Sequence, residues 1–134
     1  MLPFLLAAAV AAASPTPCPA DLLVANPRLK VVRARDRAFD NVIVTVDVTN
    51  RGVSAQLLQT RQHLELVKDG TVLGTQPVPG LGPQQNYTAA FRIQLPHEAK
   101  RAPLVVEFRY VLDSRDAPRE NCTTANDRLT ATLR

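Results

Sequence analysis

Apolar and polar residues alternate along most of the chain, which is the period of a β-strand with one buried face. The clearest example is residues 42–52, VIVTVDVTNRG, where valine occupies every second position from Val42 to Val48. Asn50 and Gly52 follow this run. We interpret them as turn residues, because asparagine bonds its own backbone and glycine accepts a positive φ. The pattern predicts a strand that places its valines in the core and ends at a turn.

The same period recurs in six further segments. Asp69 and Gly70 separate two of them, and this pair is the strongest short signal for a β-hairpin, since both residues tolerate a positive φ. No 11-residue window carries a convincing helical stripe. The alternation predicts seven strands, namely residues 21–35 with an interruption near Asn26-Pro27, then residues 41–49, 62–68, 71–78, 87–95, 106–112 and 129–133.

Seven short strands with one apolar face each must bury those faces against one another. The usual solution is two antiparallel sheets packed about 10 Å apart. The sequence therefore predicts an all-β protein, a seven-stranded immunoglobulin-like antiparallel β-sandwich. Aromatic residues are scarce, with no Trp, two Tyr and four Phe, so we expect a core of Val, Leu and Ile.

Residues 2–13 form an almost unbroken apolar run that ends in small residues. The run is shorter than the roughly 20 residues that a membrane-spanning helix needs, and it fits the apolar part of a secretory signal. Neither Lys nor Arg precedes it, so either translation starts upstream or the signal is weak. We expect residues 1–17 to be a signal peptide and residues 18–134 to be a secreted or periplasmic domain without stable membrane insertion.

Cys18 and Cys122 are the two cysteines of the chain. Two cysteines in an exported protein most simply form one disulfide. If every strand reverses direction, the first and the seventh begin at the same end of the sandwich, and each cysteine precedes one of these two strands. We therefore expect a Cys18–Cys122 bridge. In the chain-entropy model a closed loop of about 100 residues makes such a bridge stabilising by about 4.7 kcal/mol.

Several segments carry a resemblance to a known family. Residues 42–52 show a valine-rich strand followed by Asn, any residue and Gly, and residues 68–78, KDGTVLGTQPV, show a glycine turn followed by a short strand. Leu81-Gly82-Pro83 forms a small loop before the fifth strand. With these features, residues 21–133 resemble the CARDB domain, a cell-adhesion-related β-sandwich of bacteria. The resemblance implies an immunoglobulin-like fold and a binding or adhesion-type role.

The last part of the chain resembles the family less closely. Asp113, Glu120-Asn121 and Asn126-Asp127 are similar to its acidic and asparagine-rich ending. The family usually shows a second Glu and a paired Asn-Asn there, and it lacks a fixed disulfide, whereas this chain has Cys122. The departure leaves the function of this loop undetermined by the resemblance.

No constellation of residues indicates a reaction. The two histidines, His63 and His97, have no partner that the sequence reveals, and no Gly-x-Ser-x-Gly elbow is present. Acidic residues gather before the last strand, and calcium favours such oxygen-rich loops. The EF-hand spacing is absent, however, and two arginines are interleaved with the acids. We interpret the loop as charge-compensated, with Asp113 and Asn126 bonding local backbone. The sequence predicts no enzyme, no metal and no cofactor.

The net charge of +4, with thirteen Arg and three Lys, predicts a basic surface. Arg33, Arg35 and Arg37 occupy every second position, so on an extended segment they point the same way. With Arg28 and Lys30 they form a candidate cationic stripe for an anionic glycan, a lipid head group or a polyanion. An edge strand guarded by charge against aggregation explains the same residues. We expect no nucleic acid, because an aromatic stacking platform is missing.

The sequence thus predicts a secreted, non-catalytic binding or adhesion-type module of the bacterial envelope. Its expected partner is a protein or an anionic surface glycan. The alternative is a structural or chaperone-like subunit of an envelope assembly. The candidate binding surface consists of the stripe or of the acidic loop, that is, of Arg28, Arg33, Arg35 and Arg37, or of Asp113, Asp116 and Glu120.

Overall fold

The computed structural model describes residues 19–33, 38–57, 60–113, 121 and 127–134. Seven strands make up this part of the chain, as the alternation predicts. They are β1 (Leu22–Arg33), β2 (Phe39–Asn50), β3 (Gln62–Lys68), β4 (Thr71–Val78), β5 (Asn86–Pro96), β6 (Leu104–Leu112) and β7 (Arg128–Leu133).

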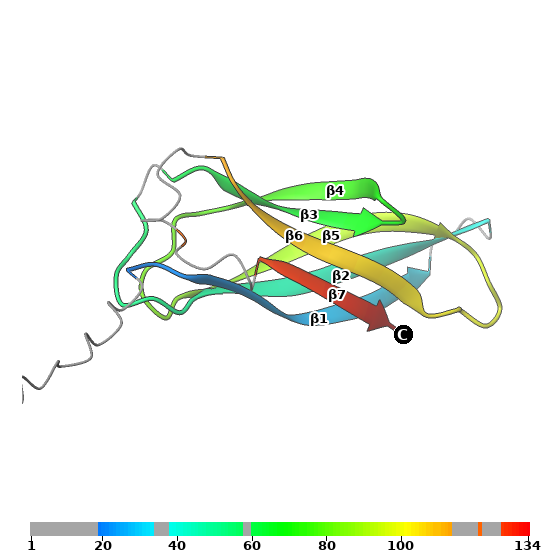
Figure 1. The fold of residues 1–134 in the computed structure, drawn as a ribbon. Helices are drawn as coiled ribbons and strands as arrows, with labels where there is room; N and C mark the ends of the chain where they lie inside the picture. The colour runs from blue at the N-terminus through cyan, green and yellow to red at the C-terminus, as the bar shows by residue number, and fades with distance from the viewer. Residues whose placement is uncertain (1–18, 34–37, 58–59, 114–120, 122–126) are drawn as a thin grey trace, which may run out of the picture.

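The strands form two sheets that face each other (Figure 1). One sheet has three strands in the order β1-β2-β5, and the other has four in the order β4-β3-β6-β7. Every pair of neighbouring strands is antiparallel. The predicted seven-stranded antiparallel sandwich is confirmed. Within the described residues, no helix is long and apolar enough to cross a membrane.

Two predicted irregularities also occur. The pairing of β1 with β2 shifts register between Ala25 and Arg28, and Asn26 has a φ of 55°. The strand therefore continues through a bulge at the position where the sequence predicts an interruption. In the β3–β4 hairpin, Asp69 and Gly70 have φ values of 50° and 77°, as a two-residue type I′ turn requires.

The core lies between the sheets and is mainly aliphatic. The alternate valines of β2, from Val42 to Val48, are all buried, as predicted. Phe91 of β5 and Phe108 of β6 bridge the two sheets with their ring centroids 6.3 Å apart. Because β2 buries every second residue, its other residues form the outer face of the three-stranded sheet.

Asn50 is a buried connector rather than only a turn residue. Its side-chain oxygen accepts hydrogen bonds from the backbone N–H groups of Gly52 (2.9 Å) and Asp21 (3.1 Å). Its amide nitrogen donates to the carbonyl oxygens of Ser54 (2.9 Å) and Leu81 (3.1 Å). The expected bond to its own backbone is present, and the bond to Ser54 lies in the same turn. The bonds with Asp21 and Leu81 join separate segments at this end of the sandwich.

Gly52 is needed for a reason other than the predicted one. Gly70 is the glycine with a positive φ in the described part of the chain, so the expectation for Gly52 is wrong. A Cβ atom on Gly52 would lie 2.3 Å from the carbonyl oxygen of Pro19 and 2.6 Å from the Cα atom of Ala20. The N-terminal segment packs directly on the Gly52 backbone, and no side chain fits between them.

Candidate functional site

The arginine stripe is described in part, and its first member is already paired. Arg28 donates a hydrogen bond to the Thr45 hydroxyl at 3.1 Å and forms an ion pair with Asp47 at 3.0 Å. Asp47 also accepts hydrogen bonds from Thr88 (2.7 Å) and Asn26 (3.2 Å). Burial raises the pKa of Asp47, but these hydrogen bonds outweigh burial and hold the pKa below its usual value. Arg28 therefore fastens the bulge of β1 to β2.

The other stripe residues add little to a described surface. Arg33 is the last residue of β1 and lies opposite Asp40 in the β1–β2 register. Arg35 and Arg37 lie outside the described residues. β1 is an edge strand, which is the setting that the aggregation-guard interpretation requires.

The acidic loop contributes one described residue, and its partner is not the one expected. The Asp113 carboxylate contacts Nδ1 of His63 at 2.8 Å, so the expectation of a local backbone partner is wrong. Nε2 of His63 lies 3.2 Å from Glu65. Burial lowers the pKa of His63, but the two carboxylates outweigh burial and raise it. Asp116, Glu120 and Asn126 lie outside the described residues, as do Cys18 and Cys122.

The second histidine is also paired, at the end of the three-stranded sheet where β2 begins and β5 ends. Asp40, at the start of β2, is buried and contacts Nδ1 of His97 at 2.9 Å. Arg101 donates to the second oxygen of Asp40. The hydrogen bond with His97, and then the one from Arg101, lower the pKa of Asp40, although burial opposes them. The sequence reveals no partner for either histidine, and the structure shows a carboxylate partner for both.

Each of these clusters joins segments that are distant in the sequence. A hydrolytic triad needs a nucleophile beside the histidine. In the part of the chain that the structure describes, both histidines hydrogen-bond to carboxylates. The same residues contain no group of three or more His, Cys, Asp or Glu positioned to hold a metal ion.

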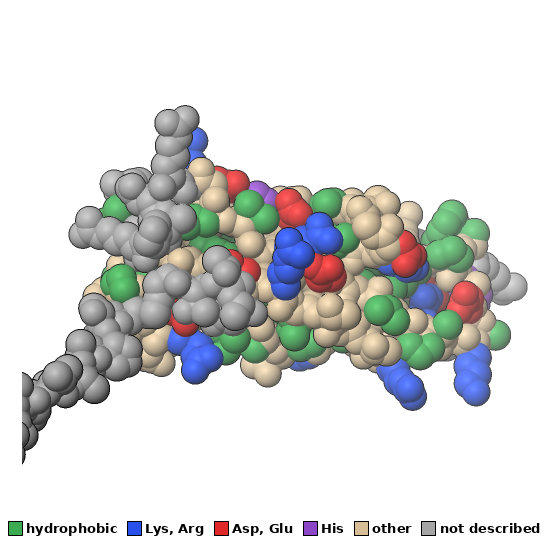
Figure 2. Space-filling view, viewed as in Figure 1, with side chains coloured by type: hydrophobic (Ala, Val, Ile, Leu, Met, Phe, Trp, Pro, Cys, Tyr) green, Lys and Arg blue, Asp and Glu red, His purple; other side chains and the backbone are tan. Residues whose placement is uncertain are grey.

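The charges on the outer face of the four-stranded sheet are largely neutralised. Figure 2 shows basic and acidic side chains next to one another over the middle of the molecule. Glu107 of β6 accepts a hydrogen bond from Arg109 at 2.8 Å, and Arg128 of β7 lies 3.9 Å away. The hydrogen bond from Arg109 lowers the pKa of Glu107. This face therefore presents few unpaired charges to a partner.

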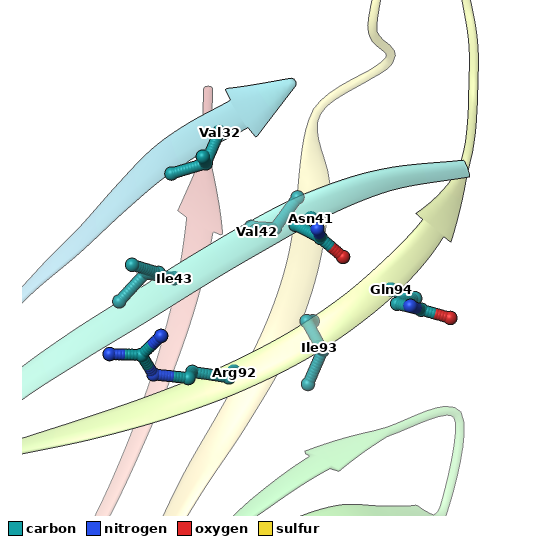
Figure 3. Close-up of a pocket in the computed structure, with 7 residues that line it drawn as sticks. All are labelled: Val32, Asn41, Val42, Ile43, Arg92, Ile93 and Gln94. Carbon is teal, nitrogen blue, oxygen red and sulfur yellow. The ribbon is translucent and has the colours of Figure 1, made fainter. Parts of the chain in front are cut away.

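The outer face of the three-stranded sheet is different. A hollow of about 490 Å³ lies on it, across β1, β2 and β5 (Figure 3). Arg92 and Ile43 are opposite each other in the β2–β5 register, and Asn41 is opposite Gln94. The residues that line the hollow are Val32, Asn41, Val42, Ile43, Arg92, Ile93 and Gln94.

None of the residues lining this hollow was a candidate from the sequence. The available signal was the strand period itself, because residues that alternate with buried positions must share the outer face. That period shows which residues point outward. It does not show that β1 and β5 lie on either side of β2, and this strand order is what gathers the hollow.

The geometry thus defines an immunoglobulin-like sandwich whose exposed sheet face, rather than a buried cleft, is the candidate site. The family model for CARDB matches residues 19–130, and the chain belongs to this family of adhesion-type binding domains. Among solved structures, it is similar to the CARDB domain of a protein from Pyrococcus furiosus, determined in complex with di-metal ions. That likeness has a TM-score of 0.49 and 16% sequence identity over 88% of this chain and 96% of that chain. No curated protein matches the sequence.

Proposed function

We propose that this chain is a secreted, non-catalytic binding module of the bacterial envelope that presents the outer face of the β1-β2-β5 sheet to its partner. The partner is a protein or an anionic surface glycan. The observation that carries the proposal is the contrast between the two outer faces. One has neutralised charges, and the other has a hollow beside basic side chains. Membership of an adhesion-type family supports the same function.

Binding is tested with isolated envelope and labelled mature protein. We expect saturable binding that falls when outward residues of β1, β2 and β5 are changed. The triple variant R33S/R35S/R37S measures how much the predicted arginine stripe contributes to binding. Unchanged binding of this variant removes the stripe from the site. Linear, non-saturable uptake of the unaltered protein would overturn the proposed function.

Export is tested separately, by expression of the full chain in a Gram-negative host. We expect the protein in the periplasmic fraction with an N-terminus near Cys18. Deletion of residues 2–13 should leave the protein in the cytoplasm, because the apolar run is what the export machinery recognises. An uncleaved chain in the cytoplasm would contradict secretion.

A structural or chaperone-like subunit is the second candidate, and one observation favours it. β4 is an edge strand, and its Val72 and Leu73 are 48% and 39% exposed. An exposed edge strand with apolar side chains can pair with a strand of another chain. A permanent subunit should co-purify in fixed stoichiometry and elute as a larger species in size-exclusion chromatography. A transient binder should elute alone.

A further inference from the structure

The three strands of the smaller sheet place a row of side chains on its outer face. In the β1–β2 register Lys30 lies opposite Ile43, and in the β2–β5 register Ile43 lies opposite Arg92. Lys30 and Arg92 are both exposed. Adjacent strands are about 4.8 Å apart, so two strand spacings, or about 10 Å, separate the backbones of the two cations. Ile43 forms an apolar floor between them.

Lys30 and Arg92 form no ion pair within the described residues, whereas Arg28 on the same face is paired. No ion pair or side-chain hydrogen bond of Lys30 or Arg92 occurs there. Asp47 is the carboxylate that the described strands place on this face, and Arg28 already neutralises it at 3.0 Å. The face therefore keeps a net positive charge beside the hollow, which favours an anionic partner.

The next row supplies hydrogen-bonding groups without charge. Asn41 of β2 lies opposite Gln94 of β5, both side chains are exposed, and both line the hollow. Each amide can donate and accept, which matches a hydroxyl group that also does both. Figure 3 shows the two amides on adjacent strands, with Arg92 and Ile43 further along the same strands.

Apolar side chains complete the surface. Val32 of β1 lines the hollow and is 40% exposed, and Phe39 is 45% exposed two residues before Asn41 on the same face of β2. An exposed aromatic ring at the end of a row of amides suits the C–H face of a sugar ring. The site thus offers two cations, two amides and small apolar surfaces, in a hollow about the size of a small-ligand site.

We propose that this hollow binds an anionic polysaccharide, that is, a sugar chain bearing carboxylate or sulfate groups. The acidic group lies between Lys30 and Arg92, and hydroxyl groups of the same or the next sugar bond Asn41 and Gln94. The inference rests on the proposed function and names the class of its partner. A protein partner fits less well, because a standard interface buries about 800 Å² per partner around a more apolar and aromatic centre.

Four polymers test the proposal by isothermal titration calorimetry with the purified exported protein. Polygalacturonate carries carboxylates, dextran sulfate carries sulfates, dextran is neutral, and polyglutamate is an acidic polypeptide. We expect saturable binding of polygalacturonate or dextran sulfate and none of dextran. The acidic polysaccharide that binds more tightly shows whether the site prefers a carboxylate or a sulfate group.

Three double variants distinguish a specific binding site from nonspecific attraction by net charge. K30Q/R92Q should weaken the affinity by about tenfold or more, because charge-assisted hydrogen bonds are lost. N41A/Q94A should weaken it severalfold although the net charge is unchanged. R51Q/K100Q removes the same charge at other exposed positions and is the matched control. It should change the affinity by less than about twofold. All three variants should keep the unfolding midpoint of the parent, since the altered side chains are exposed.

Several outcomes overturn the proposal. Equal losses in K30Q/R92Q and R51Q/K100Q would show attraction by net charge only. Polyglutamate binding as tightly as either acidic polysaccharide, with the same response to K30Q/R92Q, would assign the face to a protein. If neither acidic polysaccharide binds but envelope binding is saturable, the polysaccharide class is wrong and the proposed binding function stands. If envelope binding also fails, both are wrong.

Discussion

The buried side-chain amide of Asn50 connects several segments of the chain. It is fully buried, and its four hydrogen bonds join the segment around Asp21, the turn after β2 and the connection that contains Leu81. N50A should lower the free energy of unfolding by about 3 kcal/mol, because several buried backbone groups lose their partners. Urea denaturation measures the change. N41A, which alters an exposed asparagine of the same strand, should change stability by less than about 0.5 kcal/mol. Equal effects of the two variants would contradict the role of Asn50.

At Gly52 the lack of space for a side chain, and not the backbone conformation, requires a glycine. A Cβ atom there would meet backbone atoms of Pro19 and Ala20, which cannot rotate away as a side chain can. G52A should cost about 1–3 kcal/mol, the usual range for an overpacked site, and should loosen the N-terminal segment. Thermal unfolding and amide hydrogen exchange of residues 19–22 report the two effects.

Gly82 provides the control for this substitution. A Cβ atom on Gly82 would lie 3.4 Å from the Oε1 atom of Gln85, at the end of a flexible side chain. G82A should therefore be tolerated better than G52A. Unaltered stability and unaltered exchange in G52A would show that the segment adjusts without cost.

At the scale of the elements, the local sequence pattern predicts the bounds of a strand wherever neighbouring residues determine those bounds. The bounds of β3 and β4 agree with the predicted segments 62–68 and 71–78, because alternation and the Asp69-Gly70 turn are properties of neighbouring residues. β2 begins at Phe39, two residues before the prediction, since its pairing with β1 and β5 continues beyond the alternating run.

Partners distant in the sequence could not be predicted in this way. His63 and Asp113 are separated by 50 positions, and His97 and Asp40 by 57. Each pair meets because two strands are adjacent in a sheet, or because a loop folds back on a strand end. Strand period shows which face a side chain occupies, but strand order decides what lies beside it. The same limit hid the hollow that β1, β2 and β5 form on the outer face of their sheet.

His63 links β3 to the end of β6, and the strength of this link should depend on pH. Its pKa is raised in the folded protein, so the folded state binds the proton more tightly than the unfolded state. The stabilisation is complete below the unfolded pKa of about 6.5 and is lost as the pH rises through the folded pKa. From about pH 6 to about pH 8.5, the parent should lose more stability than H63Q, as measured by urea denaturation.

The variant D113N tests the cause of this effect. It removes the carboxylate that contacts Nδ1 of His63 and keeps the shape of the side chain. The pH-dependent part of the stability should shrink in D113N and nearly vanish in H63Q. Parallel pH curves of the parent and H63Q would show that the histidine titrates alike in both states.

At the scale of the whole molecule, both outer faces of the sandwich are built by the same strand period but carry different electrostatics. On the four-stranded sheet, Glu107 lies beside Arg109 and Arg128, so the cations are compensated from neighbouring strands. On the three-stranded sheet, Asp47 neutralises the charge of Arg28, whereas Lys30 and Arg92 have no ion pair among the described residues. A sandwich that is stable through its aliphatic core is free to differ in this way, because surface charges add little to folding. This asymmetry, which strand order creates, is the basis for proposing the three-stranded sheet as the binding face.

The end of the sandwich that holds Asn50 also brings together the two regions that flank the cysteines. The backbone N–H of Leu22 donates to the side-chain oxygen of Asn121 at 3.0 Å, and Asn121 in turn donates to Asp127 at 2.7 Å. Leu22 follows Cys18 by four positions, and Asn121 directly precedes Cys122. These contacts support the predicted bridge, although both cysteines lie outside the described residues.

The bridge should therefore be present in protein recovered from an oxidising compartment. Thiol titration under denaturing conditions should find no free thiol before reduction and two per chain afterwards. C18S/C122S should lower the free energy of unfolding by up to about 4.7 kcal/mol, because the unfolded chain regains the entropy of a loop of about 100 residues. C18S alone should lower it by a similar amount and expose one thiol. Two free thiols in the unreduced parent would contradict the bridge. The N-terminal segment would then be held by noncovalent contacts, among them the hydrogen bonds of Leu22 with Asn121 and of Asp21 with Asn50.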